Sequence, residues 1–480
     1  MMVKNSADIN PAVNKHETKR KWKIPHTYAL LFFVIVFVAA LTYVLPAGEF
    51  DRVENSATGR IVIEAESFHS VDSNPASIFD IFKSIPIGME NAGYIIFFVF
   101  IIGGSFGIIQ ATGTIETGIG AIVRKVEGKE KLVIPLFMFI FSIAGATMGM
   151  AEELLPFYPI AVALAIALKF DSIVGTSLVL LGAGAGFAGA FMNPFTVGIA
   201  QGIGELPLYS GMQFRLVMYA VMLTTGVVYV YRYAKKIQKD PKLSYMYEID
   251  STKDVSLDIQ KLGDFTTRHK LVLLIFAAGL ILIAIGVSKF GWYITELAAV
   301  FLMMGILSGI VGGLGIDKTA SEFVKGTAGM AFGALVIGIA SGIIVVLQEG
   351  RVLDTIVYSL AQLITVLPSS LAAIGMFFVQ AVINVFIPSG SGQAAASMPI
   401  MIPVADLVGI TRQTAVVAFQ FGDGILNVFQ PTSAYFMAGL ALAGIPWDKW
   451  VKFCWPLMLI WFGIASIFLF IATMINLGPF

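Results

Sequence analysis

The chain has 480 residues, of which 57% are hydrophobic and only 13% are charged, and its formal net charge is zero. Soluble globular domains carry roughly 25% charged residues, so this composition, together with a mean hydropathy of +0.84, predicts a polytopic membrane protein. Zero net charge provides no basic surface for nucleic acid, and a single cysteine excludes a disulfide framework and a multi-thiolate metal site.

Seven apolar runs are long enough to cross a membrane as single helices, which takes about 20 residues. In chain order they cover residues 26–45, 92–111, 213–233, 271–288, 293–313, 328–347 and 453–475. Residues 1–25 are too polar for a signal peptide of the usual form, and we expect them to be a cytoplasmic tail.

Four further apolar segments are interrupted by glycine, proline and polar residues. They are 132–168, broken by GATMGMAEELLP; 172–206, broken by GAGAGFAGAFMNPFT; 371–407, broken by NVFIPSGSGQAAASMP; and 411–444, broken by FGDGILNVFQPTS. Within hydrocarbon, unwound backbone survives only where it is buried in protein or faces water. The four interruptions therefore predict one shared cavity.

The interruptions recur at a constant spacing. A shift of about 237 positions places NPFT, residues 193–196, on QPTS, residues 430–433, and Arg215 on Lys452. A shift one residue larger aligns IIQATGTIET, residues 108–117, with VLQEGRVLDT, residues 346–355. Because nearly the same offset relates segments that lie far apart in the chain, the sequence predicts an internal duplication. The alternative, that glycine and proline breaks are simply common in membrane helices, stays open.

Basic residues predict the orientation of the two copies. Lysine and arginine are concentrated in the N-terminal tail, in 124–131 and in 232–270, whereas 47–77 carries only Arg52 and Arg60. By the positive-inside rule, the first three segments are cytoplasmic and the last is outside.

This orientation makes 132–168 a re-entrant hairpin that enters from the cytoplasm. A connecting helix, 271–289, reverses the chain, so that the second hairpin, 371–407, enters from outside and the C-terminus lies outside. We predict two inverted-topology repeats, 26–234 and 293–480, joined by a cytoplasmic linker, 235–270.

Three carboxylates fall within the interruptions: Glu152 and Glu153 in the first hairpin and Asp423 in the second broken helix. A carboxylate at a membrane helix centre costs about 2.5–3.5 kcal/mol, so these groups should face protein, water or a cation. We expect Arg215 and Lys452 to reach the membrane interface instead of neutralising them. The acids then predict a cationic ligand, which is Na⁺, a proton, or a substrate ammonium or guanidinium. Protonated acids, or acids bonded to hairpin N–H groups, remain the alternative.

Amide and hydroxyl side chains beside the prolines of NPFT and QPTS could bind a hard cation or a substrate, or could merely satisfy a kink. The neutral second hairpin tip, PSGSGQ, suits a carboxylate. Besides the three acids, the predicted binding residues are Asn193, Pro194, Thr196, Ser389, Ser391, Gln393, Asn427, Gln430, Thr432 and Ser433. We expect a coupling Na⁺ near Asn193, Thr196, Asp423 and Gln430.

The stretches GATMGMAEELLPFYPI, GAGAGFAGAFMNPFTVGIAQGIGELPLYSG, IPSGSGQAAASMPIMIPVADLVGITRQ and FGDGILNVFQPTSAY together resemble the YfcC-type carriers of the C4-dicarboxylate anaerobic carrier family. The similarity runs over nearly the whole chain from about residue 26. It implies an all-α protein of the ion transporter superfamily that forms a homodimer in the inner (cytoplasmic) membrane. Each subunit would have a scaffold domain and an elevator-type transport domain.

The resemblance also implies transport of basic or zwitterionic amino acids, coupled to Na⁺ or H⁺ or by exchange, with no other cofactor. Dicarboxylate carriers of the superfamily show a neutral signature at the hairpin tip, whereas this chain has AEEL there. This departure favours a cationic or zwitterionic substrate, and a dicarboxylate carrier stays the alternative.

Two other classes fit less well. An intramembrane hydrolase needs a nucleophile and a base, yet the histidines lie in tails, loops or at span ends, and no H-E-x-x-H sequence occurs. We therefore do not predict an enzyme. A channel could also contain re-entrant loops, but inverted repeats with two broken helices favour alternating access.

Overall fold

A computed structural model describes residues 27–55, 60–64, 67–126, 128–251, 265–290, 292 and 294–478. The predicted tail, 1–25, and part of the predicted linker, 252–264, lie outside the described residues. All described strands lie between the first two helices, where they form two small antiparallel sheets. β1 (Gly48–Glu49) pairs with β4 (His69–Ser70), and β2 (Arg52–Asn55) pairs with β3 (Arg60–Ile63).

The first half of the chain forms a series of long, short and interrupted helices. Its helices are α1 (Thr27–Leu41), α2 (Ile78–Asn91), α3 (Gly93–Ala111), α4 (Thr114–Lys125), α5 (Val133–Ile143), α6 (Phe157–Ala167), α7 (Ser172–Ala188), α8 (Ile199–Ile203), α9 (Met212–Lys239) and α10 (Tyr247–Asp250). Shorter helical turns are η1 (Glu130–Leu132), η2 (Ala144–Met148), η3 (Glu152–Leu154), η4 (Pro194–Gly198) and η5 (Pro241–Leu243).

The second half begins with α11 and then follows a similar order of elements. Its helices are α11 (Thr267–Phe290), α12 (Ile294–Gly312), α13 (Ile316–Gly329), α14 (Ala331–Glu349), α15 (Leu353–Thr365), α16 (Ser369–Phe386), α17 (Gly390–Val408), α18 (Arg412–Leu426), α19 (Ala434–Ala443) and α20 (Trp447–Met474). All four predicted interruptions are present as breaks between helical segments.

Most predicted spans agree with the helices. Within the described residues, six helical stretches are long and apolar enough to cross a membrane: α3, 130–148, α9, α12, α14 and α20. Helix α1 is shorter than predicted and ends at Leu41, shortly before Pro46. The predicted linker is also partly wrong, because its first residues continue α9 to Lys239.

The helices pack as two groups. In the α3 group, α3 packs on α12 and α13, while α14 packs on α1 and α2. In the α7 group, α7 packs on α5, α6 and α9, α18 packs on α16, α17 and α20, and α7 contacts α18. Helix α19 touches α14, α6 and α7, and thus joins the two groups.

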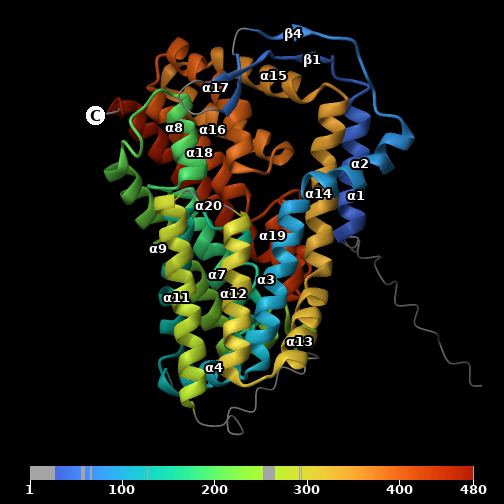
Figure 1. Cartoon of the computed structure of the whole chain (residues 1–480). Helices are drawn as coiled ribbons and strands as arrows, with labels where there is room; N and C mark the ends of the chain where they lie inside the picture. Colours follow the sequence, from blue (N-terminus) through green and yellow to red (C-terminus); the bar gives the residue numbers. More distant parts are fainter. Residues whose placement is uncertain are drawn as a thin grey trace, which may run out of the picture.

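The molecule has two distinct ends (Figure 1). α15, β1 and β4 lie at one end, which we call the strand end, and α4 and α13 lie at the other, the α13 end. The C-terminal mark also lies toward the strand end.

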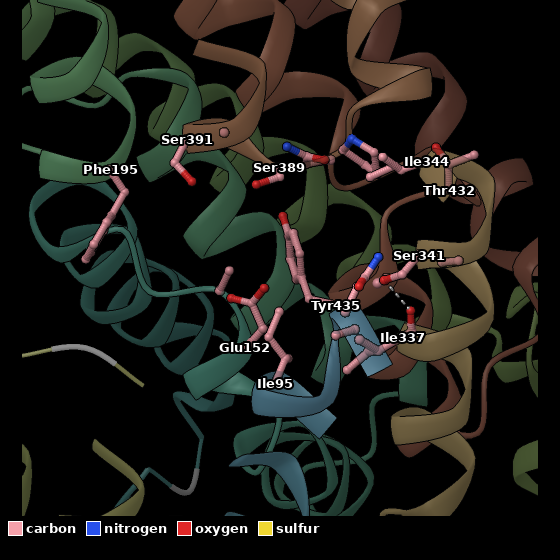
Figure 2. Close-up of a pocket in the computed structure, with 18 of the residues that line it drawn as sticks. Ile95, Glu152, Phe195, Ile337, Ser341, Ile344, Ser389, Ser391, Thr432 and Tyr435 are labelled. Atoms are coloured by element: carbon pink, nitrogen blue, oxygen red, sulfur yellow. Dashed lines mark hydrogen bonds between the residues drawn. The ribbon is translucent and has the colours of Figure 1, made fainter. Parts of the chain in front are cut away.

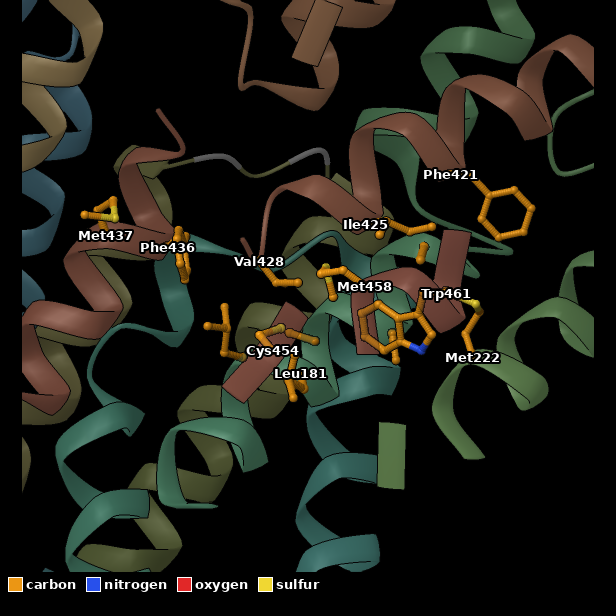
Figure 3. Close-up of a cluster of buried hydrophobic side chains, with 14 of the residues drawn as sticks. Leu181, Met222, Phe421, Ile425, Val428, Phe436, Met437, Cys454, Met458 and Trp461 are labelled. Atoms are coloured by element: carbon orange, nitrogen blue, oxygen red, sulfur yellow. The ribbon is translucent and has the colours of Figure 1, made fainter. Parts of the chain in front are cut away.

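A dry core holds the α7 group together. Leu181, Phe421, Ile425, Cys454 and Trp461 are all fully buried where α7, α18 and α20 meet (Figure 3). On the outer surface, by contrast, large apolar side chains such as Phe33, Leu274 and Leu459 are more than half exposed. Extended apolar surface of this kind is costly in water, so these faces fit a lipid environment.

Candidate functional site

A central cavity of about 410 Å³ lies where the two helix groups meet. Its walls include residues from all four interruptions, among them Glu152, Thr196, Ser389 and Asp423, and residues of α14 in the α3 group. Figure 2 shows Glu152 on one side, Ser389 and Ser391 on the other, and Tyr435 between them. The sequence prediction of one cavity shared by four breaks therefore agrees with the structure.

The first hairpin tip directs acid into this cavity. The chain turns at Gly149, whose φ of +66° is a left-handed conformation that glycine adopts readily. A Cβ at this position would lie 2.6 Å from Asn193 Oδ1, so the tip packs tightly on the first broken helix. The Ala151 N–H donates to Glu153 Oε2 at 2.9 Å, while Glu152 points toward Tyr435 (Figure 2). Glu153 thus caps the tip, and both acids line the cavity.

The second hairpin tip is neutral. Ser389 is the N-cap of α17, and its Oγ accepts from the Gly392 N–H at 3.4 Å. The first turn of α17 therefore presents its remaining N–H groups and its positive dipole end at the cavity, beside the side chains of Ser389 and Ser391. This arrangement suits an anionic group such as a carboxylate.

A buried amide network holds Asp423. Its Oδ1 accepts from Asn384 Nδ2 at 3.0 Å and from Asn427 Nδ2 at 2.8 Å. Asn384 Nδ2 also donates to Gln393 Oε1 at 2.8 Å, and Gln430 Nε2 donates to the Asn384 side-chain oxygen. The network fixes one oxygen of Asp423 and connects the second hairpin to the second broken helix.

The other oxygen of Asp423 has no hydrogen-bond partner among the residues that the structure describes. Among the described residues, Asp423 Oδ2 and Thr196 Oγ1 are both buried without a hydrogen bond. A Cβ added at Gly390 would lie 3.0 Å from that Asp423 oxygen and 2.5 Å from Thr196 Cγ2, so the three residues adjoin one another. Buried polar atoms are normally paired. A carboxylate oxygen and a hydroxyl that both lack partners among the described residues, on neighbouring side chains of one cavity wall, fit a hard monovalent cation or a substrate ammonium.

A multi-carboxylate metal centre is not indicated, because the described residues contain no group of three or more His, Cys, Asp or Glu that could hold a metal ion. Of the residues predicted for Na⁺, Thr196 and Asp423 adjoin at the cavity wall. Gln430 Oε1 is buried and has no hydrogen-bond partner within the described ranges, although Gln430 lies behind the wall. The fourth, Asn193, uses its side-chain oxygen to cap η4, accepting from the N–H groups of Phe195 and Thr196.

The predicted binding residues divide into two sets. Eight of them line the central cavity: Glu152, Glu153, Thr196, Ser389, Ser391, Asp423, Asn427 and Thr432. Five lie outside its lining: Asn193, Pro194, Gln393, Gln430 and Ser433. Gln393 and Gln430 belong to the amide network, and Ser433 occupies the N-cap position of α19.

The expectation that Arg215 reaches the interface is wrong. Its side chain is fully buried, and its Nη1 lies 3.5 Å from the Ala190 carbonyl oxygen in the first break. The backbone there has left the helix, so its carbonyl needs a donor, and Arg215 provides one. Lys452 is 63% exposed and pairs with Asp448 at 3.8 Å, as expected for an interfacial residue.

Tryptophans provide the donors at the second break. Trp450 Nε1 donates to the Val428 carbonyl at 2.9 Å, and Trp447 Nε1 donates to the Phe429 carbonyl at 3.0 Å. Both come from the start of α20. The unwound segment is therefore satisfied by side chains within the protein.

Sequence reasoning missed several residues of the cavity. Tyr435, Tyr94, Asn91 and Ser341 line it, and Asn384 holds Asp423 from behind. Two signals were present, because Tyr435 follows QPTS with only Ala434 between them, and Asn384 interrupts the apolar arm of the second hairpin. Tyr94 and Ser341 sit in otherwise uninterrupted helices, where nothing local distinguishes them.

These features define a multi-pass helical membrane protein with a polar, solute-sized cavity between two helix groups. Comparison with known proteins specifies the class. Residues 24–474 match the family of C4-dicarboxylate anaerobic carriers, DcuC. The chain therefore belongs to the C4-dicarboxylate anaerobic carrier family, which consists of transporters and not of enzymes.

Individual relatives are similar over nearly the whole chain. The chain is 36% identical over 479 residues to the Escherichia coli (strain K12) protein named "Putative basic amino acid antiporter YfcC", covering 92% of this chain and 94% of that protein. It is 29% identical to an uncharacterized Haemophilus influenzae protein, covering 92% and 95%. The solved YdaH transporter of Alcanivorax borkumensis is 16% identical with a TM-score of 0.43, covering 95% of this chain and 100% of that one.

Proposed function

We propose that this protein is a secondary active transporter of amino acids, basic or zwitterionic, in the inner membrane. The observation that carries the proposal is the charge of the central cavity. Its lining contains Glu152, Glu153 and Asp423, and no lysine or arginine is among the lining residues that the structure describes. Carboxylates without a basic partner favour a ligand with an ammonium or guanidinium group.

The two hairpin tips offer complementary chemistry for such a ligand. The acids of the first tip would bind its cationic groups, and the second tip would bind its carboxylate through Ser389, Ser391 and the start of α17. A molecule with both groups satisfies both tips at once. The name of the Escherichia coli relative supports the basic amino acids within this class.

The mechanism we propose is elevator-type alternating access by two inverted repeats. Three observations support it: the constant offset between the halves, the similar order of elements in α12–α20, and the gathering of both hairpins in the α7 group. In this scheme the α3 group is the scaffold and the α7 group moves. Transport would be coupled to Na⁺ or H⁺ or would proceed by exchange, with Thr196 and Asp423 as the cation site.

The assembly and orientation are part of the same proposal. The subunit would form a homodimer, with its N-terminus in the cytoplasm and its C-terminus outside. The C-terminal mark lies toward the same end of the molecule as β1 and β4 (Figure 1), which supports that orientation, because the segment containing these strands is poor in lysine and arginine.

A dicarboxylate carrier is the second candidate. The neutral, hydroxyl-rich second tip at the N-terminus of α17 favours it, since such a site binds carboxylate without a positive side chain. The first tip argues against it, because a second carboxylate of the solute would meet Glu152 or Glu153.

A ligand screen tests the proposal and separates the two candidates. The thermal unfolding of the purified protein is followed with arginine, lysine, alanine and succinate, each with and without Na⁺. A ligand that binds only the folded protein stabilises it by about 2.7 kcal/mol at a concentration one hundred times its Kd. We expect the amino acids to raise the unfolding temperature and succinate to leave it unchanged. Stabilisation by succinate alone would instead establish the dicarboxylate carrier.

A further inference from the structure

Two further cavities lie near the ends of the molecule and have matching residues. One, of about 260 Å³, is lined by Gln348 and Asp354 and by Arg52 of β2. The other, of about 760 Å³, is lined by Gln110, Glu116 and residues of α13. An offset of 238 positions relates Gln110 to Gln348 and Glu116 to Asp354. Each acid lies in the first turn of a short helix, α4 or α15, that follows a long one.

The carboxylate of the smaller cavity already holds a guanidinium group. Arg52 Nη2 lies 3.1 Å from Asp354 Oδ1 and 3.0 Å from Oδ2, and the Phe50 N–H donates to Oδ2 at 3.1 Å. Asp354 is only 4% exposed. This position in the fold therefore accommodates a carboxylate paired with a planar cation.

Among the residues that the structure describes, the matching carboxylate of the larger cavity has no such guanidinium partner. Glu116 Oε2 is buried without a hydrogen bond among the described residues. The nearby charges on α13 cancel, because Lys325 Nζ lies 2.8 Å from Glu322 Oε1. Glu116 thus leaves this cavity with a net negative charge, in a space large enough for an amino acid.

The first hairpin separates this cavity from the central one. The larger end cavity is lined by Pro156, Pro159 and Ala163, which lie just before α6 and along it. The central cavity is lined by Glu152 and Glu153 of the same hairpin. A solute that moves between the two cavities would pass this hairpin.

We propose that Glu116 forms a second binding site, which takes the guanidinium or ammonium group of the solute at the α13 end of the molecule. The solute binds at this site before it enters the central cavity or after it leaves that cavity. Its cationic group contacts Glu116 as Arg52 contacts Asp354. This inference rests on the proposed function for the identity of the solute. The preference for cations is a property of the cavity itself and can be measured without transport.

Thiol labelling measures this preference directly. In a Cys454→Ala background, Ala163→Cys places a thiol on the wall of the cavity. The rate of its modification is measured with 2-aminoethyl methanethiosulfonate, a cation, and with 2-sulfonatoethyl methanethiosulfonate, an anion, in the detergent-solubilised protein. We expect the cation to react faster, and Glu116→Gln to lower the ratio of the two rates about tenfold, since a carboxylate within a few ångströms attracts one reagent and repels the other. Methylguanidine should slow labelling by the cationic reagent in the protein that has Glu116. It should have no such effect in Glu116→Gln.

Two variants control for charge and folding. Glu130→Gln removes a carboxylate that does not line this cavity, so it should leave the ratio unchanged. Glu116→Asp keeps the charge and should keep the preference, which separates a loss of charge from a loss of fold. Equal rates for the two reagents, or a ratio indifferent to Glu116→Gln, would overturn the proposal. If the cavity prefers the cationic reagent but the protein transports no amino acid, the proposed function is refuted. The proposal that Glu116 forms a cation-binding site then still holds.

Discussion

Asp423 shows how one carboxylate can be held and remain available for a ligand. Asn384 and Asn427 both donate to Oδ1, which fixes the orientation of the carboxyl group. Oδ2 is buried without a hydrogen-bond partner in the described part of the chain, in a cavity wall that also contains Thr196 and Gly390. Hydrogen bonds that involve a charged group contribute about 1.5–3 kcal/mol, so a cation at Oδ2 would bind appreciably tighter than at a neutral amide.

Neutral substitutions of the three acids test this role. We expect Asp423→Asn and Glu152→Gln to weaken amino acid or Na⁺ binding by about ten- to a hundredfold, with normal membrane expression. Glu153→Gln should have a smaller effect, because its amide oxygen can still accept from the Ala151 N–H. Asp317→Asn, at an exposed acid in the first turn of α13, is the matched control. Wild-type transport by all three variants would remove the acids from the mechanism.

Gly390 sets the spacing between the second hairpin and the first broken helix. A Cβ there would lie 2.5 Å from Thr196 Cγ2, so Gly390→Ala should displace the tip and reduce the transport rate at least tenfold. Gly392→Ala is the control, since its nearest contact would be 3.3 Å. Thr196→Ser removes the clashing methyl group and should restore activity to Gly390→Ala. If the double variant stays inactive, the clash with the Thr196 methyl group is not the cause of the loss.

At the scale of the element, each break leaves backbone carbonyls that need hydrogen-bond donors, and different side chains provide these donors at the two breaks. Unwound carbonyls accept from Arg215 at the first break and from Trp447 and Trp450 at the second. The sequence located both breaks, because glycine, proline and amide residues within apolar runs are a strong local signal. It could not assign Arg215, since the position of its partner depends on tertiary packing.

Paired alanine substitutions compare the two breaks. We expect Asn193→Ala with Thr196→Ala, and Gln430→Ala with Ser433→Ala, to reduce transport by a comparable order of magnitude. The first pair loses the η4 cap and a cavity hydroxyl, and the second loses a donor of the amide network. Initial uptake rates, corrected for the amount of protein in the membrane, give the comparison. A loss limited to one pair would mean that the two breaks have different roles.

The sequence predicted some helices correctly and missed others, and the difference has a physical reason. Long apolar helices and their interruptions follow from hydropathy, because hydrocarbon requires a minimum length and tolerates few breaks. The short amphipathic helices α2, α4, α13 and α15 were missed, since their polar residues resemble loops when only apolar runs are considered. The same limit hid Asn384, a polar residue in an apolar arm, although it completes the site around Asp423.

At the scale of the whole molecule, both hairpins lie in the α7 group and their tips share one cavity. Arms α5 and α6 pack on α7, while α16 and α17 pack on α18, and α7 and α18 contact each other. The two tips are therefore parts of one packed unit. If that unit moves relative to the α3 group, access to both tips should change together.

Accessibility labelling tests this coupled movement. With Cys454 replaced, single cysteines at Ala151 and at Ser391 are labelled in sealed vesicles by a membrane-impermeant thiol reagent from each side. We expect substrate and Na⁺ to shift both labelling rates between the two sides. A cysteine at Ile316, exposed at the start of α13, provides a control whose accessibility should not respond. Labelling of each tip from one fixed side, in protein that still transports, would contradict the movement.

The two tryptophans at the start of α20 have a further consequence. Their indole nitrogens bond to Val428 and Phe429, and the neighbouring Asn427 and Thr432 line the central cavity. Indole emission responds to the hydrogen bond of the ring nitrogen and to the local electric field. The protein has six tryptophans, and two of them are attached to the backbone of the second break. Occupation of the cavity should therefore change the intrinsic fluorescence, which gives the transporter a built-in optical signal for ligand titration without any added label.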